Sequence, residues 1–84
     1  MDCEFDIHYA MTPEELVEKA ATGIKNQGGE FEGDTNSGSF SMRNPVIIRG
    51  NYTINGQVVH VAITKRPLVV PCNIIKNKLE ELIN

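Results

Sequence analysis

The sequence has few of the residue patterns that identify a catalytic or metal site. Its only two cysteines, Cys3 and Cys72, stand far apart, and neither lies in the CxxC or Cys/His spacing of a structural zinc site. The sequence therefore predicts two reduced thiols in a cytosolic protein, with a disulfide between them as the open alternative. No metal ligand set and no cofactor is expected.

Long apolar runs are missing as well. The first segment, MDCEFDIHYA, is acidic and lacks the apolar core of a secretory signal, and no stretch approaches the ~18 apolar residues of a membrane span. We therefore expect a cytoplasmic protein with no membrane span. At 84 residues the chain has room for one domain, residues 1–84, built around one core.

The net charge of −3 conceals an asymmetry between the two halves of the chain. Residues 1–42 hold nine acidic and two basic residues, whereas residues 43–84 hold six basic and two acidic ones. If the two halves meet in the fold, most of this charge is compensated locally. The alternative is a basic patch that binds an anionic partner.

The stretch from 46 to 64 predicts the central hairpin of the fold. Asn55-Gly56 is the strongest two-residue turn signal, because both central positions of a type I′ turn need a positive φ. This turn predicts one set of cross-strand pairs on the apolar face: Ile54 with Gln57, Tyr52 with Val59, Gly50 with Val61, and Ile48 with Ile63. The opposite face is polar.

Four further elements surround this hairpin. Residues 3–9 alternate between apolar and polar side chains, as in a half-buried strand. A helix is expected from Thr12-Pro13, with Glu15 completing a capping box, to the glycine pair at 28–29. Residues 30–42 predict a second hairpin with Phe31 facing Phe40. A last amphipathic helix begins near Pro71.

Prolines punctuate the remaining segments. Asn44-Pro45 is expected to break the chain before the central hairpin, and Pro67 and Pro71 bracket an extended connector. The sum is an α+β two-layer sandwich of order β-α-β-β-β-β-α, in which two helices pack on one face of a mainly antiparallel sheet.

If both helices cover the apolar face, the opposite face of the sheet stays open. Its candidate surface patch consists of Arg49, Asn51, His60 and Thr64. No nucleophile–base–orienter set accompanies His60, so no catalytic residue is assigned and the protein is predicted not to be an enzyme. The first hypothesis is a small binding module of the cytoplasm that docks a protein partner, an apolar surface or a second copy of itself through this face.

Two other functions remain open. A carrier of a small acyl ligand would hold it between the helices and the sheet, against four apolar residues: Phe31, Phe40, Tyr52 and Val61. An RNA-binding module is the third hypothesis and the least favoured one. The last helix opens without the lysine cluster of a double-stranded-RNA-binding domain, and no aromatic side chain is assigned outward for base stacking.

Four parts of the sequence resemble the small polyhydroxyalkanoic-acid-system family of short bacterial proteins. They are HYAMTPEE at residues 8–15, the Gly33-Asp34 turn before Ser39-Phe40-Ser41, Gly50-x-Tyr52-x-Ile54, and the ending from Pro67 to Leu82. The chain lacks the tryptophan expected just before the Gly33 turn. The resemblance implies association with storage granules or acyl metabolism, without catalytic residues, and thus an accessory role.

Overall fold

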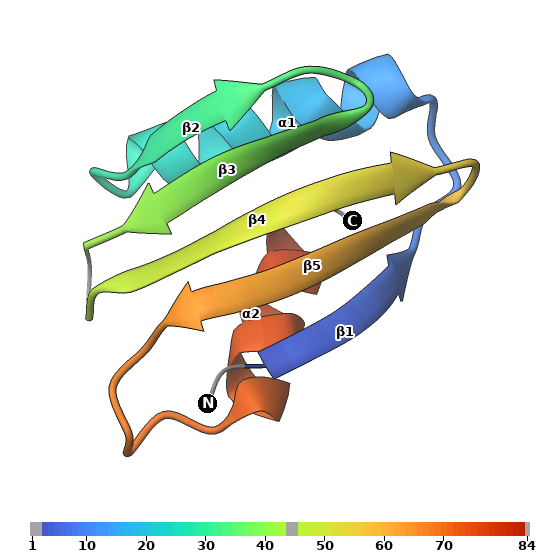
Figure 1. The fold of residues 1–84 in the computed structure, drawn as a ribbon. Coiled ribbons are helices and arrows are strands. Elements are labelled where there is room, and N and C mark those ends of the chain that lie inside the picture. Colours follow the sequence, from blue (N-terminus) through green and yellow to red (C-terminus); the bar gives the residue numbers. More distant parts are fainter. Residues whose placement is uncertain (1–2, 44–45, 84) are drawn as a thin grey trace.

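A computed structural model describes residues 3–43 and 46–83 of the chain. The elements are β1 (Cys3–His8), α1 (Pro13–Asn26), β2 (Glu30–Gly33), β3 (Ser37–Met42), β4 (Ile48–Asn55), β5 (Val58–Lys65) and α2 (Cys72–Ile83). The strands form one sheet in the order β1-β5-β4-β3-β2, with antiparallel neighbours throughout. Both helices lie on the same face of this sheet (Figure 1). The predicted two-layer α+β sandwich is confirmed.

Helix α1 begins where its capping residues predict. The Thr12 hydroxyl accepts a hydrogen bond from the Glu15 backbone N–H at 3.2 Å, and the Glu15 carboxylate accepts one from the Thr12 N–H at 3.1 Å. Pro13 occupies the first helical position. Leu16 and Ile24 are buried against the sheet side. The cap and the apolar stripe thus fix the start and the orientation of the helix.

The central hairpin keeps its predicted faces but not its predicted pairs. Tyr52 pairs with Val61 rather than Val59, and the two turn residues are Gly56 and Gln57. Gly56 has φ of +63°, while Gln57 keeps a negative φ. The partners therefore differ from the prediction by two residues, and a shift of two leaves every side chain on its expected face.

Contacts with the segment after β1 explain this register. Gln57 donates its side-chain amide to the carbonyls of Tyr9 at 2.8 Å and Met11 at 3.1 Å. Tyr9 in turn donates its hydroxyl to the Gly56 carbonyl at 2.6 Å, and its backbone N–H to the Gln57 carbonyl. These bonds need Gln57 at the turn, so tertiary contacts override the local preference of Asn55-Gly56.

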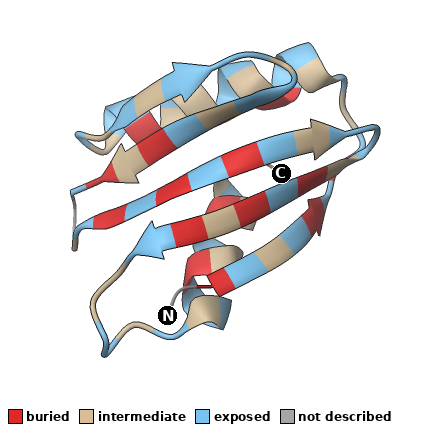
Figure 2. Cartoon of the chain, in the orientation of Figure 1, coloured by how far each residue is buried: buried red, intermediate tan, exposed pale blue. Residues whose placement is uncertain are grey.

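The core lies between the helices and the inner face of the sheet. Buried and exposed residues alternate along the strands (Figure 2). The buried core residues are Cys3, Ile7, Tyr9, Leu16, Ile24, Phe40, Met42, Ile48, Tyr52, Val59, Val61, Ile63, Ile75, Leu79 and Ile83. Phe31 pairs with Phe40 as predicted.

The connector between β5 and α2 differs from the expected extended segment. The Val70 N–H donates to the Pro67 carbonyl at 3.1 Å, so Pro67–Val70 is a β-turn. Pro71 then precedes the first turn of α2, as expected. The other predicted break, Asn44-Pro45, lies outside the described residues.

The two cysteines are joined, contrary to the prediction of free thiols. A disulfide links Cys3 at the start of β1 to Cys72 at the start of α2, with 5.8 Å between their Cα atoms. The two cysteines are 69 residues apart in the sequence, and this spacing does not predict their contact. The contact arises because β1 pairs with β5 and α2 packs beside β1.

Candidate functional site: the open face of the sheet

The face of the sheet that points away from the helices is polar over its full width. The register aligns small polar or alanine side chains in the middle with acidic ones at both edges: Glu4, Ala62, Asn51, Ser39 and Glu32 form one such row from β1 to β2. The adjacent row runs Asp6, His60, Thr53 and Ser37. Apart from His60, the central side chains of these rows are short.

His60 lies between two carboxylates of the edge strand β1. Its Nδ1 is 2.7 Å from an oxygen of Asp6, and its Nε2 is 3.2 Å from an oxygen of Glu4. The hydrogen bond to Asp6 raises the pKa of His60 above its ordinary value, with a smaller contribution from Glu4 and a partial offset from desolvation. The imidazole is therefore already engaged within the protein.

Arg49 and Lys65 are direct neighbours across β4 and β5. A β-bulge follows Arg49 in the register, and Arg49 then pairs with Lys65 while Gly50 pairs with Ile63. Both side chains are exposed. Thr64, the extra residue of the bulge, donates its hydroxyl to the Arg49 carbonyl at 3.3 Å. The bulge thus places two positive charges side by side.

A shallow trough of about 780 Å³ crosses the sheet beside Arg49. We call it the basic trough; its main polar walls are Lys25, Ser41, Arg43, Arg49, Asn51 and Thr64. Glu30 and Glu32 also line it, and Glu30 forms an exposed ion pair with Arg43 at 3.7 Å. Three cations and two acids line the trough, an excess of one positive charge, and outside the Arg43–Glu30 pair Lys25 and Arg49 face Glu32, so the trough suits an anionic or hydrogen-bonding group.

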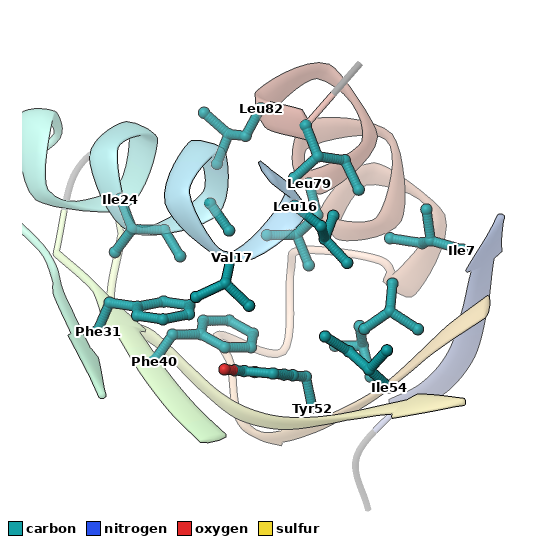
Figure 3. Close-up of a pocket in the computed structure, with 14 residues that line it drawn as sticks. Ile7, Leu16, Val17, Ile24, Phe31, Phe40, Tyr52, Ile54, Leu79 and Leu82 are labelled. Atoms are coloured by element: carbon teal, nitrogen blue, oxygen red, sulfur yellow. The ribbon is translucent and has the colours of Figure 1, made fainter. Parts of the chain in front are cut away.

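The apolar residues proposed to face a ligand line a small cavity. Phe31, Phe40, Tyr52 and Val61 surround about 50 Å³ between the sheet and the helices (Figure 3). Phe31 stacks on Tyr52 with ring centroids 5.5 Å apart. The Tyr52 hydroxyl donates to the Asp34 carbonyl at 2.7 Å, and burial raises the pKa of Tyr52, with the Asp34 charge adding to it. Pockets for small ligands usually measure about 300–1,000 Å³.

The predicted surface patch is only partly one site. Arg49, Asn51 and Thr64 come together in the basic trough, whereas the His60 side chain contacts Asp6 of β1. Lys25 and Arg43 are further members of the trough that the sequence does not predict. Their position depends on how the hairpin of β2 and β3 and the end of α1 meet β4, and no local sequence signal reports that arrangement.

Other site types are not supported within the described residues. No group of three or more His, Cys, Asp or Glu side chains in 3–43 and 46–83 is placed to hold a metal ion. In the same part of the chain, no helix is long and apolar enough to cross a bilayer. The chain matches no protein-family model, no curated protein and no solved structure.

Proposed function

We propose that this protein is a small non-enzymatic binding module that engages an acidic segment of a protein partner through the open face of its sheet. The basic trough provides the charged groups for this contact, and the short side chains around Asn51 and Ser39 allow close approach. Antiparallel sheets commonly leave one face to solvent. The distribution of charge on this face therefore supports the proposal.

The single observation behind it is the Arg49–Lys65 pair. Like charges directly opposite each other on neighbouring strands destabilise a sheet. Neither side chain has an ion-pair partner within the described part of the chain. A carboxylate-bearing partner would remove this repulsion, which gives a reason for cations at both positions.

The alternative function is the acyl carrier. A cavity of about 50 Å³ is several times smaller than the ~300 Å³ at the lower end of small-ligand pockets, so a fatty acyl chain would need the core to open. The resemblance to the polyhydroxyalkanoic-acid-system family still suggests acyl or granule-related metabolism. RNA binding stays the third proposal.

One NMR experiment separates these functions. The ¹⁵N-labelled, disulfide-bonded protein is titrated separately with a decapeptide of glutamate, a medium-chain 3-hydroxy fatty acid and a double-stranded RNA. We expect the peptide to shift the amides of Ser41, Arg43, Arg49 and Thr64. Arg49→Glu should weaken this binding by about fivefold, or about 1 kcal/mol, because it reverses one exposed charge.

Lys19→Glu is the matched control, since it makes the same charge change on the exposed side of α1. Equal weakening by both variants would show only a dependence on net charge and would refute the trough. Shifts at Tyr52 and Val61 with the fatty acid, and none in the trough with the peptide, would favour the carrier. Binding of RNA alone would favour the third proposal.

A further inference from the structure

Two aliphatic side chains occupy the tip of the turn between β5 and α2. Leu68 and Val69 are the two central residues of the Pro67–Val70 β-turn, and they are 94% and 88% exposed. Central turn positions normally carry Gly, Pro, Asn, Asp or Ser, each for a conformational reason. Neither turn chemistry nor burial in the core therefore accounts for leucine and valine here.

The turn that presents them is braced on both sides. Arg66 lies across its base and donates from Nη1 to the carbonyls of Pro67 at 3.4 Å and Val70 at 2.9 Å. Two residues after the end of the turn, Cys72 is joined to Cys3 of β1 by the disulfide. A braced turn loses little conformational entropy when its tip binds another surface. Leu68 and Val69 are thus held in exposed positions before any partner binds.

Apolar surface continues from the tip onto the body of the protein. Val70 and Ile74 line a groove of about 290 Å³ together with Val46, Met42 and Ile48. Ile74, on α2, is 52% exposed. Because Val70 directly follows the tip residues in the chain, the exposed tip adjoins this largely apolar groove.

Several basic residues lie at the same end of the sheet as this surface. The chain directions bring the end of β5, the start of β4 and the end of β3 to one edge of the sheet, and the Pro67–Val70 turn projects from that edge (Figure 1). Lys65 precedes the turn, Lys78 borders the groove, and Arg43 and Arg49 stand at the neighbouring strand ends. Glu30 forms an ion pair with Arg43.

We infer that this end of the protein docks on the surface of an anionic phospholipid bilayer. Leu68 and Val69 enter the boundary between headgroups and acyl chains, and Lys65 and Lys78 contact the negative headgroups. Aliphatic residues flanked by cations have the composition that interfacial binding requires. A second copy of the chain fits less well, because docking tip against groove would bring both sets of cations together.

The apolar tip of Leu68 and Val69 lies outside the basic trough, whereas Lys65 also belongs to the Arg49–Lys65 pair behind the proposed function, so the tip variant is the one that separates the two proposals. The test is flotation of the disulfide-bonded protein with phosphatidylcholine vesicles that contain 30% phosphatidylserine, and with pure phosphatidylcholine vesicles. We expect binding to the anionic vesicles only. Leu68→Ser/Val69→Ser should weaken it at least about tenfold, because two apolar side chains no longer leave water. Lys65→Glu should weaken it at least about fivefold.

Two controls match these variants. Val58→Ser removes an aliphatic side chain at the opposite end of β5, and Lys19→Glu changes a charge on α1; neither should alter flotation by more than about twofold. Both tip residues are nearly fully exposed, so their variant should retain the melting temperature of the wild type.

Absence of binding to the anionic vesicles, or equal binding by the tip variant, would overturn the inference. Self-association that requires Leu68 and Val69, without vesicle binding, would assign the surface to a second copy instead. The tip variant should still bind the glutamate peptide through the basic trough, so a failure of one proposal is distinguishable from a failure of the other.

Discussion

Nδ1 of His60 lies 2.7 Å from Oδ1 of Asp6, across the antiparallel pair of β5 and β1. Glu4 approaches the other ring nitrogen at 3.2 Å, so both nitrogens face a carboxylate. The hydrogen bond to Asp6 and then that to Glu4 favour the charged imidazolium and raise the pKa of His60. The stabilisation is therefore complete below the unfolded-state pKa of about 6.5 and is lost as the pH rises through the higher folded-state pKa.

His60→Gln should consequently lower the free energy of unfolding more at pH 5.5 than at pH 8.5. The difference should stay below about 1 kcal/mol, because all three side chains are substantially exposed to solvent. Urea unfolding at the two pH values measures it. His8→Gln is the control for loss of an imidazole on the same face. A His60→Gln effect that grows with pH would contradict the ion-pair assignment.

How much the sequence predicts depends on the range of the interaction. The capping residues Thr12 and Glu15 fix the start of α1 locally, and alternation fixes which face of β4 and β5 is buried; the structure agrees with both. The sequence does not predict the contact between His60 and Asp6, because tertiary packing determines that β1 pairs with β5. The same holds for Lys25 and Arg43 in the basic trough.

The hairpin register shows where a strong local signal loses to tertiary contacts. Tyr9 donates to the Gly56 carbonyl at 2.6 Å and thereby fastens the turn between β4 and β5 to the segment after β1. Tyr9→Phe should lower the free energy of unfolding by about 1 kcal/mol. It should also speed amide hydrogen exchange at the turn, most of all at Gln57 and Val58.

Tyr52→Phe is the comparison variant, because it removes an analogous bond to the Asp34 carbonyl in the other hairpin turn. Its cost should be similar, but faster exchange should appear around Asn36 and Ser37 instead. Identical exchange patterns in the two variants would mean that neither hydroxyl acts on its own turn.

The disulfide between Cys3 and Cys72 should be a major source of stability. It closes a loop with a sequence separation of 69 residues, and constraining the unfolded chain over that length contributes about 4 kcal/mol. Cys3→Ala/Cys72→Ala should show this loss in urea unfolding, and a reductant should destabilise the wild type but not the variant. Two titratable thiols in the protein before reduction would contradict the bond. Because the cytoplasmic prediction drew on free thiols, the disulfide removes that part of its support.

Gly23 and Gly50 offer a matched test of where the core has spare room. A Cβ at Gly23 in α1 would meet Leu82 Cδ2 at 2.9 Å, the far end of a flexible side chain that lines the cavity of about 50 Å³. Leu82 has space to move, while alanine is favoured over glycine inside a helix by about 1 kcal/mol. Gly23→Ala should therefore raise the free energy of unfolding by up to about 1 kcal/mol.

At Gly50 in β4, by contrast, an added Cβ would meet the Ala62 carbonyl oxygen and Phe40 Cζ, both at 2.8 Å. Backbone and a buried ring cannot yield as a leucine end can, so Gly50→Ala should lower the free energy of unfolding by more than about 1 kcal/mol. Thermal and urea unfolding of the two variants give the comparison. If Gly23→Ala also lowers the free energy of unfolding, the Leu82 side chain cannot move into the cavity. That result would count equally against any acyl ligand entering between α1, α2 and the sheet, because such a ligand needs the same side chain to move.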